Sequence, residues 1–268
     1  MNKEDDLDRV TGTQLLDRAV AVLKFLGQAG ETGARATAIA EAVGLKPSTA
    51  HRIIGALERH SLIEREHATR QYRLSVALFA LGSQAAEGTG LRRLVRPGLL
   101  RLAAETGDTV FLMARTGVSA VCIDRQEGTY MIASLTGYVG GQIPMGVGPA
   151  SQAILACLPR KEAEAIVTIN AGRYAAFNGL SAQEVLDELP RIPARGYAID
   201  DGRLVEGISA IAVPIQPGGR DVVASISINM TSARLSADRR DQIVGFLKRE
   251  VEEIEASLTA PRRRRARA

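Results

Sequence analysis

The chain has 268 residues, of which 46% are hydrophobic and 24% charged, a composition typical of a soluble protein with one large domain or two modest ones. Collagen-like repeats, extensive disorder and a disulfide scaffold are therefore excluded. The net charge of +4 is uneven: residues 1–75 carry 11 basic and 10 acidic groups, residues 76–258 carry 18 and 20, and residues 259–268 carry five arginines.

The sequence offers no pattern for a metal, a cofactor or a membrane. Cys122 and Cys157 are the only cysteines, and no Cys or His cluster has the spacing of metal ligands, so we expect neither a bound metal nor a cofactor. No apolar run approaches the roughly 18 residues of a membrane-spanning helix, and the acidic residues 2–8 do not resemble a signal peptide. A cytoplasmic protein is expected.

Three helices are predicted in the first 75 residues. Residues 13–28 form an amphipathic helix, and a second short helix ends at Gly44, a residue suited to the left-handed turn after a helix. Pro47 is favoured at the first position of a third helix. The apolar positions at helical spacing are, in the first helix, Leu15, Leu16, Ala19, Val20, Val22, Leu23 and Leu26; in the second, Ile39, Ala40 and Val43; and in the third, Ala50, Ile53, Ile54 and Leu57.

Two short strands, 62–66 and 71–74, follow around a polar turn and predict a β-hairpin. This order of elements indicates a winged helix-turn-helix over residues 1–75, in which the start of the third helix enters the DNA major groove. The same elements also occur in protein-interaction modules, and that alternative stays open. Residues placed to contact bases or phosphates are Lys46, Ser48, Thr49, His51, Arg52, Arg59, Arg65, Arg70 and Arg73.

The runs 16–23, 39–54 and 57–58 closely resemble the DNA-binding domain of IclR-family bacterial transcriptional regulators, and the similarity extends over residues 12 to 258. The resemblance implies that Ser48, Thr49, His51 and Arg52 open the recognition helix and that the partner is double-stranded operator DNA. Many family members have Ser or Thr as the cap of the second helix, where this chain has Arg35. Arg35 is instead available to reach a phosphate.

The next segment, residues 76–90, is predicted to be a linker helix. The helix that follows, residues 92–106, is expected to start close to Arg96, because Pro97 is unfavourable inside a helix. Strands at 110–114 and 119–124 form a hairpin around Thr116-Gly117, and a third strand is predicted at 131–135.

The remaining elements complete an α+β domain with an antiparallel sheet flanked by helices. After a glycine-rich stretch at 137–148, helices are predicted at 149–158 and 160–170, from the capping box that begins at Ser181, and at 236–258, with strands at 208–215 and 221–229. The runs 122–128, 195–201 and 224–229 resemble the family's GAF-like effector domain, which assigns that role to residues 91–258. Residues 259–268 are predicted to be a basic, disordered tail with a salt-sensitive attraction to DNA.

Three features suggest a ligand site in this domain. Ser225, Ser227 and Asn229 alternate along one strand, and they line an enclosed space if helices cover that face but are simply wet if it is open. The glycine-rich run 144–151 leads to a helix start, which favours an anion such as a carboxylate, and Asp200 is the third element. The resemblance implies a pocket for a small organic or aromatic acid, at positions matching Met145, Pro149, Ala150, Asp200, Ala210, Ser227 and Asn229.

Two matches depart from the family pattern. Pro149 has no N–H to donate, and Ala210 stands where some members have a polar or thiol side chain. No catalytic residue is predicted, because this domain has no histidine to activate Cys157, and Asp200 and Asp201 would point to opposite sides of an extended strand.

The sequence thus predicts a ligand-responsive regulator, a repressor of a neighbouring catabolic operon. It would bind a palindromic operator as a homodimer formed through the first and linker helices, or as a dimer of dimers. The alternatives are a small-molecule enzyme whose winged helix makes protein contacts, and a constitutive DNA-binding protein without a ligand.

Overall fold

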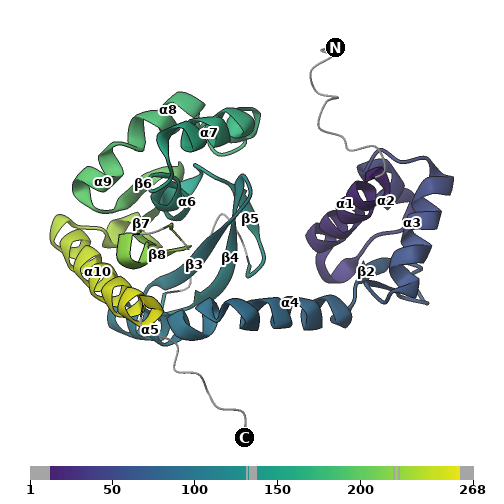
Figure 1. Cartoon of the computed structure of the whole chain (residues 1–268), viewed down its shortest axis with the longest axis horizontal. Coiled ribbons are helices and arrows are strands. Elements are labelled where there is room, and N and C mark those ends of the chain that lie inside the picture. The colour runs from purple at the N-terminus through teal and green to yellow at the C-terminus, as the bar shows by residue number, and fades with distance from the viewer. Residues whose placement is uncertain (1–12, 131, 133–137, 220, 223, 260–268) are drawn as a thin grey trace, which may run out of the picture. The chain divides into compact units, whose positions relative to one another are not determined.

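The computed structural model describes residues 13–130, 132, 138–219, 221–222 and 224–259, without the side chains of residues 83 and 85–89 (Figure 1). The chain divides into two compact units, Met1–Thr89 and Gly90–Ala268. Apart from Ile132, the strand predicted at 131–135 lies outside the described residues, as does the predicted tail beyond Thr259.

The first unit contains the predicted winged helix-turn-helix. Its core holds the predicted apolar faces of the second and third helices, together with Ile63 and Tyr72 of the hairpin strands. Gly44 follows the second helix with a φ of 63°, the left-handed conformation that the sequence predicts there. The elements are α1 (Gln14–Ala29), the short 3-10 helix η1 (Gly30–Thr32), α2 (Ala36–Ala42), α3 (Pro47–Arg59), β1 (Ile63–Arg65), β2 (Tyr72–Leu74) and α4 (Val76–Thr89).

Part of the predicted apolar face of α1 is not in this core. Val22 and Leu26 are buried, but Leu15 and Leu16 are 64% and 65% exposed and Val20 is 39% exposed. On α4, likewise, Val76, Phe79 and Leu81 are exposed. Both helices therefore present large apolar side chains that their own unit does not cover.

The second unit begins with α5 (Leu91–Thr106), where the predicted start close to Arg96 is wrong. The helix starts directly after Gly90, which has a left-handed φ of 65°, and Pro97 lies inside it with an exposed ring. Arg92 and Arg96 form ion pairs with the buried carboxylate of Asp124, at 3.3 and 3.2 Å. These ion pairs stabilise the first turn of α5, although Pro97 has no N–H to donate to a carbonyl group of that turn.

A six-stranded antiparallel sheet follows, in the order β5-β4-β3-β8-β7-β6. The sequence does not predict β5, which is three residues long and lies in the glycine-rich stretch, or β6, which carries Asp200, Asp201 and a register irregularity between Asp201 and Val205. The strands are β3 (Thr109–Thr116), β4 (Ser119–Gln126), β5 (Gln142–Pro144), β6 (Ala198–Val205), β7 (Ile208–Ile215) and β8 (Ala224–Thr231).

Helices cover both faces of the sheet (Figure 1). On one face α5 and α10 (Ala237–Thr259) pack against side chains such as Leu112 and Ile226. On the other lie α6 (Gly148–Leu155), α7 (Arg160–Tyr174), α8 (Ala182–Glu188) and the unpredicted short helix α9 (Arg191–Arg195). The predicted capping box begins α8, where the backbone N–H of Ser181 donates to Glu184 at 2.9 Å. The predicted α+β architecture is confirmed.

Candidate DNA-binding surface and ligand cavity

Helix α3, the predicted recognition helix, has one buried and one exposed face. Its apolar residues are buried in the core of the first unit, whereas Lys46, Ser48, His51 and Arg52 are exposed and Thr49 is partly exposed. None of these five side chains has a hydrogen bond or an ion pair with another described residue. Their polar groups are therefore available to a ligand that reaches the start of α3.

A concave basic surface lies beside this helix. It encloses about 550 Å³ and contains Arg35, which precedes α2, together with His51 of α3 and Arg65 and Arg70 of the hairpin. No acidic residue lines it within the described part of the chain. The guanidinium of Arg65 also lies over the ring of Tyr72, 5.6 Å from its centroid. Such a surface suits a strand of phosphates, because its positive charges are not neutralised within the protein.

Arg73 is placed differently from the other predicted basic residues. Its Nε lies 2.7 Å from the Glu64 carboxylate on the paired strand, and it lines a separate hollow with Glu31 and Glu66. The hydrogen bond that Arg73 donates to Glu64 raises the pKa of Arg73, with a smaller electrostatic contribution from the same carboxylate. Arg73 is thus already paired, whereas Arg70 is not in contact with a described carboxylate.

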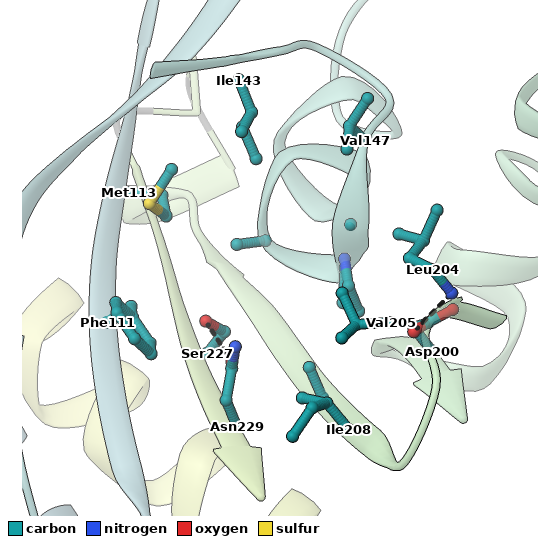
Figure 2. Close-up of a pocket in the computed structure, with 14 residues that line it drawn as sticks. Phe111, Met113, Ile143, Val147, Asp200, Leu204, Val205, Ile208, Ser227 and Asn229 are labelled. Carbon is teal, nitrogen blue, oxygen red and sulfur yellow. Dashed lines mark hydrogen bonds between the residues drawn. The ribbon is translucent and has the colours of Figure 1, made fainter. Parts of the chain in front are cut away.

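The second unit contains a cavity of about 60 Å³ between the sheet and α6 (Figure 2). Six of the seven residues predicted for a ligand site line it: Pro149, Ala150, Asp200, Ala210, Ser227 and Asn229. The seventh, Met145, does not line the cavity. It is fully buried in the core between α6 and α7, and its carbonyl oxygen accepts a hydrogen bond from the hydroxyl of Tyr174 at 2.6 Å.

The rest of the cavity wall is mostly apolar, and apart from Val147 and Gly148 in the predicted run 144–151 it was not predicted. Phe111 could have been found, because it lies on β3 directly opposite Ser227 of β8 and so faces the same side of the sheet. The lining residues at the turn from β6 to β7 could not be found in this way, because the sequence does not predict β6. The additional lining residues are Phe111, Met113, Ile143, Val147, Gly148, Leu204, Val205 and Ile208.

The polar face of β8 is covered by α6 rather than open to water. The hydroxyl of Ser225 donates to the carbonyl oxygen of Ala150 at 2.8 Å, and Ser227 is only 3% exposed. The Ser227 hydroxyl donates to Oδ1 of Asn229 at 3.3 Å (Figure 2). This face of the strand therefore lines an enclosed space, and the alternative of a wet strand face is wrong.

The glycine-rich loop before α6 is held by several hydrogen bonds. Gly146 has a φ of 100°, its N–H donates to Ser151 Oγ at 3.0 Å, and its carbonyl accepts from the Gln152 amide at 3.1 Å. Asn170 donates to the carbonyl of Val118 at 2.7 Å, next to the same loop. The loop fixes the position of the first turn of α6, which forms one wall of the cavity.

Among the described residues, Asp200 is the only ionisable one that lines the cavity. Burial raises the pKa of its carboxyl, and hydrogen bonds from the backbone N–H groups of Leu204 and Arg203 only partly oppose this. The Arg203 guanidinium is directed elsewhere, to Glu184 at 2.8 Å. Asp201 accepts a hydrogen bond from Ser209 at 2.7 Å. The two neighbouring carboxylates therefore have different environments and do not form an acid–base pair.

Replacing Asp200 with Asn is expected to raise the thermal midpoint at neutral pH. A carboxyl whose pKa is raised by folding stabilises the fold only while protonated, so its contribution is lost as pH rises through the folded pKa. The gain should shrink as the pH falls through the folded pKa, because the wild-type carboxyl is then protonated. Scanning calorimetry at several pH values, with Asp201→Asn as control, measures it. A loss of midpoint that is larger at neutral than at acid pH would contradict the prediction.

Cys157 does not have the surroundings of a nucleophile. Burial raises the pKa of its thiol, which donates to the carbonyl of Ala153 at 3.4 Å. A raised pKa lowers the fraction of reactive thiolate at neutral pH. The described residues include no cluster of three side chains suited to a metal ion. None of the described helices combines the length and apolar character needed to cross a membrane.

Two family models match most of the chain. The IclR helix-turn-helix domain matches residues 15–67, and the bacterial transcriptional regulator IclR C-terminal model matches residues 83–256. The HTH-type transcriptional repressor AllR of Salmonella typhi is 27% identical over 230 residues, which is 85% of this chain and 84% of that protein.

Solved structures share the fold. An IclR transcriptional regulator from Alicyclobacillus acidocaldarius is 25% identical, with a TM-score of 0.77 over 90% of this chain and 97% of that one. An IclR homologue from Microbacterium hydrocarbonoxydans, complexed with 4-hydroxybenzoate, is 21% identical, with a TM-score of 0.77 over 92% of this chain and all of that one. Since the matched models and relatives are regulators, the chain belongs to the IclR family as a DNA-binding transcriptional regulator and not an enzyme.

Proposed function

We propose that the protein represses a neighbouring catabolic operon in the cytoplasm by binding a palindromic operator as a homodimer or a dimer of dimers. The observation that carries this proposal is the exposed, unpartnered polar face of α3 beside the concave basic surface. In a winged helix-turn-helix, such a helix start reads the major groove while the flanking cations contact phosphates. Repression is favoured because AllR, which this chain resembles, is a repressor.

The homodimer is supported by the uncovered apolar residues of α1 and α4. Leu15 and Leu16 on α1, and Val76 and Phe79 on α4, are each more than 60% exposed. Clustered apolar side chains on a soluble protein mark an interaction surface. A second copy of the chain is the partner that a palindromic operator requires, because each copy reads one half-site.

The cavity is proposed as the effector site, and the effector would shift the protein between forms with different affinity for DNA. A neighbour of the same fold is complexed with 4-hydroxybenzoate, which supports a small-molecule role for this domain. The sequence predicts a carboxylate effector. The lining does not support that charge, because the one ionisable residue that the described part of the chain contributes to it is the acidic Asp200.

Arg52→Ala is expected to weaken binding to DNA from upstream of the protein's own gene by about tenfold, since one base contact contributes about 1–3 kcal/mol. Fluorescence anisotropy of a labelled duplex at low salt measures the change. Arg73→Ala is the matched control and should change the affinity less than about threefold, because Arg73 is already paired with Glu64. Equal losses in the two variants would contradict the assignment of α3 as the reading element, and wild-type protein that fails to bind at all would overturn the proposed function.

A further inference from the structure

The lining of the cavity in the second unit does not have the positive charge expected of a site that binds an acid. Of the described residues that line it, ten are apolar and a single one, the acidic Asp200, is ionisable. Within the described residues, no lysine, arginine or histidine lines it. A carboxylate that entered would lose its hydration and meet a like charge instead of a counter-ion, which is unfavourable in apolar surroundings.

Arginines near the cavity are engaged elsewhere. Arg125 lies 5.5 Å from the centroid of the Phe111 ring, and its guanidinium is 2.7 Å from the carboxylate of Glu127. Arg203 is paired with Glu184 on α8. The start of α6 offers one N–H fewer than usual, because its first turn contains Pro149. The surroundings of the cavity therefore do not compensate for the absence of a cation in its lining.

The polar groups in the wall nevertheless form a distinct set. The Asp200 carboxylate accepts from the backbone N–H groups of Leu204, at 3.3 Å, and Arg203, and its two oxygens have further lone pairs that can accept from a ligand. The Ser227 hydroxyl donates its proton to Asn229, so the hydroxyl oxygen is still able to accept a hydrogen bond. No described residue accepts from the amide nitrogen of Asn229, which can therefore donate to a ligand. Figure 2 shows Asp200 on one side of the cavity and the Ser227–Asn229 pair on another. The wall thus offers acceptors at two places and a donor at one.

We propose that the cavity selects a small, uncharged and mostly apolar molecule that carries a hydroxyl group, and that it rejects carboxylates. This inference rests on the proposed effector role of the cavity. A hydroxyl group both donates and accepts, so it matches the acceptors at Asp200 and Ser227 and the donor at Asn229 without bringing a charge into the apolar wall. The volume of about 60 Å³ limits the ligand to a small molecule.

Three single-ring probes that differ in charge test the inference: phenol, benzoate and benzylammonium. Each is titrated into the full-length protein at neutral pH and constant ionic strength, and the affinity is obtained from the shift of the thermal midpoint. Phenol should bind at least about tenfold more tightly than either ion, because desolvation penalises both charged probes. Ala210→Leu, which fills the cavity, should abolish the effect of phenol, whereas Ala171→Leu on the exposed face of α7 should not.

Asp200→Asn removes the negative charge and keeps an oxygen that accepts from Leu204. It should raise the affinity for benzoate by about tenfold and change that for phenol by less than about threefold. Wild-type protein that binds benzoate or benzylammonium as tightly as phenol overturns the inference, and so does the absence of any stabilisation by the three probes. DNA binding is measured separately by anisotropy. If this inference alone fails, DNA binding is retained, whereas failure of the proposed regulator function is seen as a loss of DNA binding.

Discussion

A variant with Phe79 replaced by Asp is expected to be monomeric and to bind operator DNA about 100-fold more weakly than the wild type. Phe79 is 74% exposed on α4, so the substitution leaves the core of its unit unchanged. It places a charge in the proposed apolar contact between two copies, where desolvation is unfavourable. Once the copies separate, each half-site is bound alone, and the gain from linking two binding events, about 10²–10⁴, is lost.

Light scattering coupled to size exclusion gives the mass, and anisotropy with a full operator and with a single half-site gives the affinities. Leu16→Asp on α1 should act in the same direction, because Leu16 is 65% exposed. Ile169→Asp is the matched control: Ile169 is 64% exposed on α7 in the other unit, so dimerisation through α1 and α4 predicts no change of mass. A Phe79→Asp protein that remains dimeric would exclude α4 from the interface.

Gly146→Ala is expected to destabilise the second unit by about 4 kcal/mol, through backbone strain and overpacking of about 1–3 kcal/mol each. Gly146 has a φ of 100°, which side-chain-bearing residues rarely adopt, and an added Cβ would lie 2.6 Å from the Tyr174 hydroxyl and 2.9 Å from Val185. Neither neighbour can move easily, since both are fully buried. Urea unfolding followed by circular dichroism measures the loss.

Gly140→Ala separates the two causes. Gly140 has a similar φ of 93°, but an added Cβ meets no described atom within 4 Å, so only the strain remains, about 2 kcal/mol. In the Gly146→Ala background, Tyr174→Phe removes the oxygen nearest to the new Cβ, and the double variant should be more stable than the sum of the single changes predicts. Equal losses for Gly140→Ala and Gly146→Ala would show that steric contact contributes nothing.

Much of the fold could be predicted because local pattern and tertiary packing agree. In α3, Pro47 marks the start and the apolar spacing marks the buried face, and both are found in the structure. Pro97 shows the limit of such reasoning, since the ion pairs of Asp124 with Arg92 and Arg96 connect residues that are far apart in the sequence. The apolar face of α1 shows another limit, because periodicity locates a face but does not say whether its own unit covers it.

The candidate sites could be predicted only in part, because they too depend on contacts between residues that are far apart in the sequence. The alternation of Ser225, Ser227 and Asn229 locates them on one face of β8, but the charge of the cavity depends on which residues of β3, β6 and β7 meet there. In the wing, the sequence shows that Arg70 and Arg73 are basic. Only the pairing of β1 with β2 shows that Glu64 lies opposite Arg73.

The outermost strands of the sheet in the second unit also determine how copies of the protein can associate. Exposed, regular edge strands invite hydrogen bonding between molecules and lead to aggregation. Here β5 offers only three residues, and β6 carries Asp201 and Arg203 in exposed positions at its register irregularity. Both edges are poor templates for another strand. Pairing of strands between molecules is therefore unfavourable. Copies of the protein are expected to associate through helical surfaces instead, and such contacts do not extend a sheet from one molecule to the next.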